Sequence, residues 1–295
     1  MMLPLTDPLL LVFVALLALT LGSFLNVVIA RLPVMLSRQW TLEAHQTLAL
    51  TSSTQTQTQT QTQTTYNLLV PRSRCPECDT TIAWHDNIPL VGYLKRRGRC
   101  AQCQGHISVQ YPLVEAASLA LVLWVVWLHG LTFTGLAFAL AGLTLLTLAV
   151  IDLRTLLLPD VLTLPLLWGG LLYQSTAHPD RLAESVIGAA AGYSIAWGFY
   201  WLFRLATGKE GLGRGDFKLL AALGAWCGWQ SLPLILVLSA TAGAVLGIIL
   251  QLLLPRLRGA PMPFGPFLSA AGMLVLLGGD RVIELYYTVI GLSSI

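Results

Sequence analysis

The residues with the clearest chemical potential are four of the five cysteines, which form two pairs, Cys75 with Cys78 and Cys100 with Cys103. In each pair two residues separate the cysteines, so one turn offers two thiolates to the same ion. Four thiolates complete a tetrahedral zinc site and leave no open position for a substrate. The spacing therefore predicts one structural zinc ion (Zn). Disulfides or unpaired thiols are the alternatives, and disulfides are rare in the cytosol.

Three aspartates stand at the borders of apolar runs, where a carboxylate is costly unless it has a partner or a function. Asp152 ends one run, Asp160 follows Pro159, and Asp216 ends a Gly-Arg-Gly-Asp motif at the head of another run. Two carboxylates that share a site of low dielectric constant resist double ionisation, which leaves one acid and one base near neutral pH. The alternative for the glycine motif is a turn whose aspartate caps a helix, and capping is the expected role of Asp160.

The elements that must position these residues are long apolar segments. Hydrophobic residues make up 55% of the 295-residue chain and charged residues only 11%, against about 25% in soluble proteins. Apolar runs near the length of a membrane helix cover about residues 8–30, 113–128, 136–151, 161–173, 182–205, 217–229, 232–254 and 267–277. We therefore expect an all-α polytopic membrane protein with about eight transmembrane helices. The run 217–229 is short enough to be re-entrant instead.

Charge indicates the topology of this membrane protein. Most Lys and Arg residues fall in the polar stretch 31–111 and in alternate loops after it, so the positive-inside rule places that stretch and Asp152 and Asp216 at the cytoplasmic face. Two predicted membrane crossings separate these two aspartates. Because the number is even, both aspartates are expected at the same face of the membrane. The net charge of +3 is explained by these loops. It gives no support to nucleic-acid binding, whereas the basic loops suit contact with anionic membrane lipid.

Three parts follow from this pattern. Residues 1–30 are expected to form the first transmembrane helix, 31–111 a small zinc-ribbon-like cytoplasmic module between helices 1 and 2, and 112–295 the membrane-embedded domain with the aspartates. Within the module, residues 51–65 are rich in Gln and Thr, and residues 55–64 alternate strictly between the two. Such a segment buries nothing apolar and is expected to be a disordered insert.

With these residues in view, the sequence resembles the type IV prepilin peptidase family, the bifunctional leader peptidases and N-methyltransferases of bacterial inner membranes. The resemblance is carried by residues 22–29 and 31–33, both cysteine pairs, Asp152 with residues 158–165, residues 208–220, and residues 263–267. It implies an intramembrane aspartic endopeptidase in which Asp152 and Asp216 are the catalytic pair. The implied substrates are prepilins or pseudopilins, cleaved at the cytoplasmic face and then methylated on the new N-terminus with S-adenosylmethionine.

The methyl-donor site is less well marked, because no glycine fingerprint of a nucleotide-binding fold is present. Gly98 and Arg99, just before Cys100, match a stretch that the family links to methylation, and Glu43 is a weaker candidate from its place after the first helix. A second class of function stays open, a zinc-clamped membrane transporter or scaffold with the aspartates as an ion or proton relay. A relay prefers ionisable groups near the middle of the membrane, whereas these aspartates stand at the ends of apolar runs.

Overall fold

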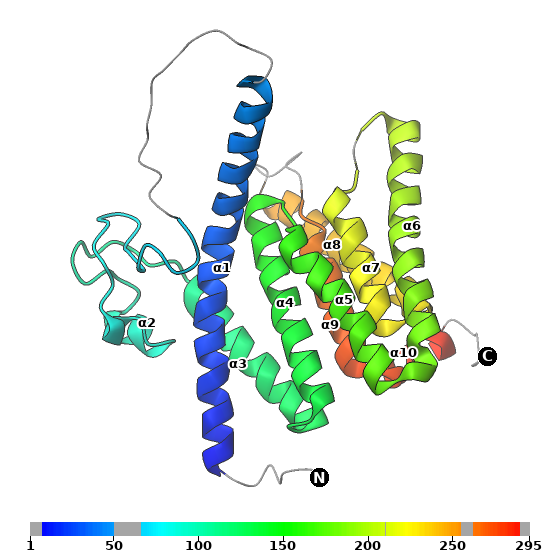
Figure 1. The fold of residues 1–295 in the computed structure, drawn as a ribbon, viewed down its shortest axis with the longest axis horizontal. Coiled ribbons are helices and arrows are strands. Elements are labelled where there is room, and N and C mark those ends of the chain that lie inside the picture. The colour runs from blue at the N-terminus through cyan, green and yellow to red at the C-terminus, as the bar shows by residue number, and fades with distance from the viewer. Residues whose placement is uncertain (1–7, 50–65, 210, 255–261, 290–295) are drawn as a thin grey trace. The chain divides into compact units, whose positions relative to one another are not determined.

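The computed structural model describes residues 8–49, 66–209, 211–254 and 262–289 (Figure 1). These residues form helices and loops, and the described ranges contain isolated β-bridges but no strand. The chain divides into two compact units, one with residues up to Leu123 and one with residues from Trp124 onward. The predicted Gln/Thr insert, residues 51–65, lies outside the described residues.

The first unit contains one long helix and the cysteine module. Helix α1 (Pro8–Ala49) precedes the module, whose short helices are η1 (Trp84–Asp86) and α2 (Val91–Arg96), and α3 (Gln110–His129) follows it. Helices α1 and α3 touch closely at Gly22, where an added Cβ would lie 3.0 Å from the Cα atom of Glu115 and the Cβ atom of Ser118. Small residues allow such approach between membrane helices.

Helix α1 does not end at Arg31 and Pro33, as the sequence suggested, but continues to Ala49. Pro33 removes one main-chain donor, and membrane helices tolerate this loss because the freed carbonyl finds other partners. Beyond Pro33 the chain is rich in residues that favour helix, such as Leu36, Gln39 and Glu43. The 42-residue helix is about 63 Å long at 1.5 Å per residue, so it exceeds the apolar core of a bilayer.

The second unit is a helical bundle. Its helices are α4 (Phe133–Thr155), α5 (Asp160–Ala177), η2 (Pro179–Arg181), α6 (Leu182–Thr207), α7 (Arg214–Cys227), η3 (Trp229–Ser231), α8 (Leu232–Leu253), α9 (Gly265–Gly278) and α10 (Asp280–Val289). Helix α7 lies at the centre, against α6, α5 and α9 (Figure 1). From residue 216 to residue 226 every side chain of α7 except Lys218 is buried, which is typical of a helix enclosed by others.

Glycines let α6 and α7 approach backbone to backbone. A Cβ atom added to Gly188 would lie 2.4 Å from the carbonyl oxygen of Gly224, and one added to Gly192 would lie 2.6 Å from that of Leu220. A larger residue at either position would force the two helices apart, so these glycines place α7 and the aspartate at its start.

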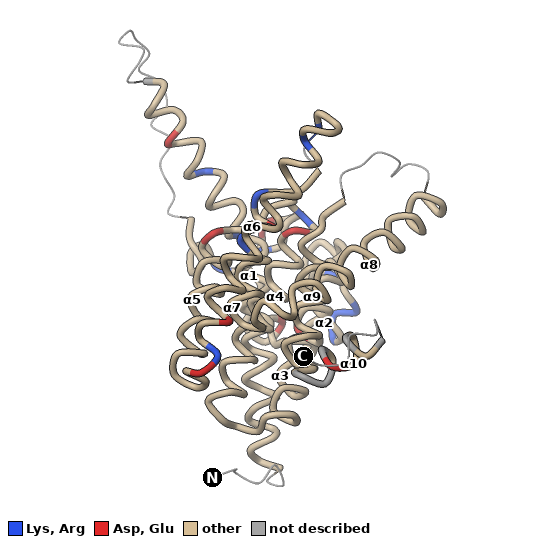
Figure 2. The backbone as a smooth tube through the Cα atoms, turned by 90° about the vertical axis from the view of Figure 1, so that its right-hand side faces the viewer, with Lys and Arg blue, Asp and Glu red and all other residues tan. Residues whose placement is uncertain are grey.

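Six of the eight apolar runs lie within single helices, whereas 217–229 continues past α7 through Gly228 into η3 and 232–254 extends one residue past α8. Five helical segments among the described residues are long and apolar enough to cross a membrane. These segments are α1, α3, α4, η2 with α6, and η3 with α8. Figure 2 shows long stretches of the helices without a charged residue. The protein is thus a helical multi-pass membrane protein. Helix α7, with 14 residues, is only about 21 Å long, and the count of eight crossings stays a prediction.

Candidate active site and metal centre

Two buried carboxylates lie at one end of the second unit. Asp152 stands in the last turn of α4 and Asp216 in the first turn of α7, with 5% and 7% of their surfaces exposed. The main-chain N–H of Gly265, the first residue of α9, donates to Oδ2 of Asp152 at 3.0 Å. The N–H of Gly213 donates to Oδ2 of Asp216 at 3.1 Å. Each carboxylate is therefore held through one oxygen by a rigid main-chain donor.

The structure brings Asp152 and Asp216 together, close enough for their charges to interact. The side chain of Leu158, in the loop between α4 and α5, lies next to a glycine that neighbours each aspartate. A Cβ atom added to Gly215, beside Asp216, would lie 2.7 Å from Leu158 Cβ, and one added to Gly265 would lie 3.3 Å from Leu158 Cδ1. Leu158 thus packs against Gly215 and Gly265, the glycines next to the two carboxylates in α7 and α9.

Asp160 has a different role from the expected cap. Pro159 is the N-cap of α5, and both carboxylate oxygens of Asp160 accept from Nζ of Lys218, at 2.6 and 2.7 Å. This ion pair joins the start of α5 to the second turn of α7, where Lys218 stands two residues after Asp216. Both side chains are partly solvent-exposed.

Sequence reasoning assigned no role to Gly265, Leu158 or Lys218. For Gly265 a signal was present, since it lies in the stretch Pro263–Phe267 that carried part of the resemblance, and proline at the second helical position marks a helix start. Its contact with Asp152 spans 113 positions of the chain, and no local pattern encodes such a contact.

The four paired cysteines come together in the first unit, with all sulfur atoms within 4.8 Å of one another. The Sγ atoms of Cys75 and Cys103 lie 3.8 Å apart, and those of Cys78 and Cys100 lie 3.9 Å apart. Tetrahedral zinc with bonds of about 2.3 Å sets its sulfurs about 3.8 Å apart, so the donor set fits zinc. These separations are too long for disulfides, whose sulfurs lie about 2.05 Å apart.

Local hydrogen bonds lower the pKa of the Cys78 and Cys100 thiols. Hydrogen bonds with Thr80 lower the pKa of the Cys78 thiol to about 6, which favours the thiolate that a metal requires. In each turn the N–H of the first cysteine donates across the loop, from Cys75 to Thr80 and from Cys100 to Gly105. Neither His85 nor His106 belongs to the cluster of possible ligands among the described residues.

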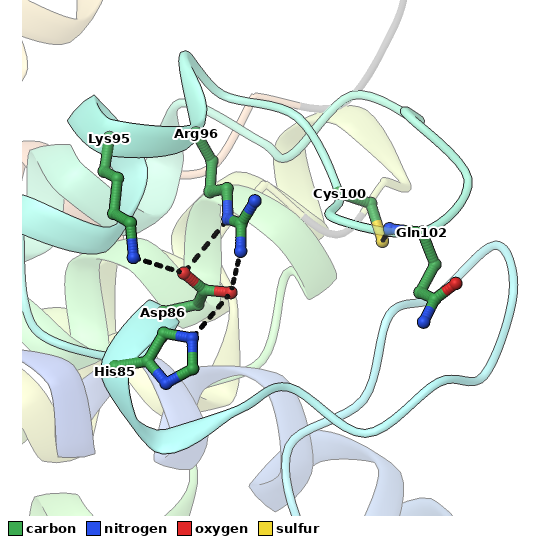
Figure 3. Close-up of polar contacts among 6 residues, drawn as sticks. All are labelled: His85, Asp86, Lys95, Arg96, Cys100 and Gln102. Carbon is green, nitrogen blue, oxygen red and sulfur yellow. Dashed lines mark hydrogen bonds and ion pairs between the residues drawn. The ribbon is translucent and has the colours of Figure 1, made fainter.

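An ion-pair cluster around Asp86 orders the module beside the cysteines (Figure 3). Arg96 donates to both oxygens of Asp86, at 3.0 and 2.7 Å, and Lys95 donates at 3.4 Å. The Arg96 hydrogen bonds hold the pKa of the Asp86 carboxyl below its usual range. Lys95 and Arg96, two of the three cations at 95–97, are thus paired with Asp86. These ion pairs connect α2 to η1.

The candidate methyl-donor residues do not form one site among the described contacts. Gly98 has a φ of +69°, and a Cβ atom there would lie 2.8 Å from the hydroxyl of Tyr93, so packing already requires glycine. Arg99 forms an isolated bridge with His106. Glu43 is exposed on α1, where its Oε1 accepts from Gln39. The side chain of Tyr93 thus occupies the space beside Gly98.

Together, the helical bundle and its pair of buried aspartates define a multi-pass membrane protein with a two-carboxylate site. Comparison with protein families agrees with this class. Residues 16–129 match the bacterial peptidase A24 N-terminal domain, and residues 138–248 match the type IV leader peptidase family. The chain belongs to the type IV leader peptidase family.

Several curated relatives are similar over nearly the whole chain. A prepilin leader peptidase/N-methyltransferase of Aeromonas hydrophila is 49% identical over 275 residues, 93% of each chain. Proteins of the same name from Stutzerimonas stutzeri and Pseudomonas aeruginosa are each 46% identical, the first over 95% of both chains and the second over 92% of this chain and 91% of its own. No solved structure matches this chain significantly.

Proposed function

We propose that this protein cleaves the leader peptide of type IV prepilins or pseudopilins and then methylates the new N-terminal amine with S-adenosylmethionine. Membership of the family and the name shared by relatives of 46–49% identity support both activities. The observation that carries the peptidase assignment is the pair of buried carboxylates, Asp152 and Asp216, brought from α4 and α7 to one point.

The geometry suits general acid and base catalysis. In both aspartates a main-chain donor occupies Oδ2, and Oδ1 has no hydrogen bond among the described residues, so one oxygen of each is available to water or substrate. One carboxylate takes a proton from water, whose oxygen bonds to the scissile carbonyl carbon. The other, protonated, gives its proton to the amide nitrogen as the C–N bond breaks. The products are a leader carboxylate and a free amine, with no covalent intermediate.

Methylation and zinc are supported less directly. S-adenosylmethionine would supply the methyl group, and Gly98, Arg99 and Glu43 remain candidates for its site. Cys75, Cys78, Cys100 and Cys103 would hold zinc. A shell of four cysteines has no position for water, so the ion would act by holding the module in shape.

We place the protein in the bacterial inner membrane with the aspartates at the cytoplasmic face. Basic residues gather at the same end of the second unit as Asp152 and Asp216, at the ends of α4 and α6 and the start of α7. They are Arg154, Arg204, Lys209, Arg214 and Lys218. By the positive-inside rule this end is cytoplasmic. A relay function is not favoured, because the carboxylates stand at helix ends and the relatives are named as peptidases.

The test is mass spectrometry of a purified prepilin incubated with the protein, with and without S-adenosylmethionine. The wild type should release the leader and, with the donor present, add one methyl group to the product. Asp152→Asn and Asp216→Asn should each lower cleavage by about 10²- to 10⁴-fold, since an amide keeps the shape but cannot exchange the proton. Both variants should still insert into membranes. Substantial cleavage by either variant would remove the assignment of the catalytic pair.

A further inference from the structure

The cysteine module carries large apolar side chains on its surface. Four of them lie on η1, on α2 or in the turn between these helices. They are Trp84, Ile88, Val91 and Leu94, with 77%, 41%, 55% and 72% of their surfaces exposed. We call these four residues the apolar face of the module. An exposed group of this kind marks a surface that contacts a protein or a membrane.

Helix α2 presents different sides to the module and to its surroundings. Gly92 is buried against the main chain of Asp86, and Arg96 donates to both oxygens of the Asp86 carboxylate (Figure 3). Val91 and Leu94 are three positions apart, so they lie next to each other on another side of the helix. Both stay exposed. The helix is therefore amphipathic, with its apolar side turned away from Asp86.

Contacts within the first unit place α2 beside the membrane helices. The N–H of Leu90, the N-cap of α2, donates to Oε2 of Glu115 at 2.8 Å, and Glu115 packs against Gly22 of α1. Gly22 precedes Arg31, the first cation of α1, by nine positions, which is about 14 Å along the helix. Helices that lie in a membrane surface bury their apolar side about 5–10 Å deep. The start of α2 thus lies at the level of the lipid.

Cations accompany the apolar face. Nζ of Lys95 lies 3.4 Å from Asp86, and 52% of the Lys95 side chain is exposed. Arg97 is exposed and forms no ion pair with any of the described residues. Residues 66–109 contain six Lys and Arg residues against three Asp and Glu residues. Long cationic side chains beside an apolar surface reach the lipid headgroups, where they attract anionic lipid.

We propose that the apolar face of the module enters the headgroup layer of the membrane, and that Lys95 and Arg97 bind anionic phospholipid there. The level of α2 beside α1 and α3 favours lipid over a protein partner, and the excess of positive charge selects the anionic headgroup. This contact holds the module against the bilayer at the place where α1 and α3 leave it. The inference does not depend on the proposed peptidase function.

The test is photo-crosslinking of the full-length protein in nanodiscs that contain equal amounts of phosphatidylglycerol and phosphatidylcholine. The photoreactive residue p-benzoylphenylalanine replaces Leu94, and mass spectrometry identifies what becomes attached to it. Phosphatidylglycerol should be attached about 5-fold or more often than phosphatidylcholine, the preference that one nearby cation provides. The matched control places the same photoreactive residue at Gln102, which is exposed on the second cysteine turn, apart from α2 (Figure 3). It should attach little lipid.

A pair of charge variants tests the cations. Lys95→Gln combined with Arg97→Gln should keep attachment of lipid at position 94, because the apolar side chains remain, but should lower the preference for phosphatidylglycerol to about 1-fold. Lys95→Arg combined with Arg97→Lys keeps both charges and should keep the preference.

Three results would overturn the inference. Attachment of position 94 to another part of the protein, or to a second protein, would mean that protein covers the apolar face. Equal attachment of lipid at positions 94 and 102 would mean that α2 has no special place at the membrane. A preference for phosphatidylglycerol that survives Lys95→Gln with Arg97→Gln would remove the role of the cations. If the variant at Leu94 does not insert into membranes, the photoreactive residue at Val91 replaces it, with the same expected results.

Discussion

Gly265 shows how one missing methyl group can place a carboxylate of the proposed catalytic pair. A Cβ atom at this position would lie 2.6 Å from Oδ2 of Asp152, so any other residue must displace either α9 or the aspartate. We expect Gly265→Ala to lower cleavage by about 10²-fold, the usual cost of misplacing a reacting group by about 1 Å. The measurement is kcat/KM for leader release.

The matched control for Gly265→Ala is Gly198→Ala on α6, where an added Cβ atom meets nothing within 4 Å. Alanine favours helix over glycine by about 1 kcal/mol, so the control should keep full activity and unfold at the same or a higher temperature. Normal cleavage by Gly265→Ala would show that Asp152 does not need its present position.

Asp160 provides a test of a charged residue near the pair that does not take part in catalysis. Its ion pair with Lys218 is partly exposed, with 53% and 34% of the two side chains accessible, and such pairs contribute about 0.2–1 kcal/mol. Asp160→Asn should therefore retain most of its cleavage activity. Asp180→Asn, at an exposed position, is the control for the change itself. Loss as severe as that of Asp216→Asn would place Asp160 among the catalytic residues.

At this scale, sequence reasoning located residues whose chemistry is rare in their surroundings. Aspartates at the borders of apolar runs and cysteines in close pairs attract attention by type and spacing, and the structure gathers each set. Leu158 and Gly265 could not be found that way, because their roles depend on contacts between segments far apart in the chain. The ion pair of Asp160 was missed for the same reason, since Lys218 lies 58 positions away.

At the scale of elements, hydropathy located the apolar helices but not all of their ends. Helix α1 continues through Pro33 to Ala49, because a hydropathy pattern reports the environment of a segment, whereas a helix ends where its hydrogen bonds end. Helix α7 illustrates the opposite limit. It is among the most buried helices, yet with 14 residues it is too short for hydropathy and length to show whether it crosses the membrane.

Arg31 of α1 binds the segment 67–71, which follows the Gln/Thr insert. Its guanidinium donates to the carbonyl oxygens of Asn67, Leu68 and Pro71 at 2.9, 3.4 and 2.6 Å, and Arg38 lies 4.4 Å from the centre of the Tyr66 ring. These contacts hold the start of the module against α1.

Deleting residues 55–64 should therefore leave cleavage and methylation nearly unchanged. The cost of closing a flexible loop changes only logarithmically with its length, by about 0.6 kcal/mol for each doubling. Arg31→Ala, which removes the three hydrogen bonds, should lower the thermal stability of the protein more than the deletion does. Both activities and the unfolding temperature would be measured for each variant. A deletion that abolishes proteolysis would show that the insert is ordered or contacts substrate.

At the scale of the whole molecule, the division into units parallels the two family matches. The boundary between Leu123 and Trp124 lies within the first match, residues 16–129, and the second match, residues 138–248, falls wholly in the second unit. The metal cluster belongs to one unit and the carboxylate pair to the other. Helices α4 and α7, which carry the carboxylates, each pack on α5 and α9, and the core cluster that they share contains no residue of the cysteine module among the described residues.

This separation leads to a prediction about the two activities. Replacing Cys75 and Cys78 together by Ser removes half of the thiolates. The proposed zinc ion, about one per chain, should then be lost, and the module should lose its shape. Methylation should then fall to near background. Proteolysis should fall less, through weaker engagement of the leader, because the carboxylates are held by helices of the other unit. Cys227→Ala, which changes a cysteine outside the cluster, should keep its metal.

Elemental analysis of the purified variants, beside the mass of the product from uncleaved and precleaved prepilin, distinguishes the possible results. Retention of metal by the double variant would mean that the four sulfurs do not form one site. Complete loss of cleavage with normal methylation of precleaved substrate would reverse the proposed division, since the module would then serve the peptidase. If methylation is lost and cleavage persists, the ion acts only on the unit that contains its ligands, as expected for a metal whose coordination shell is closed to water.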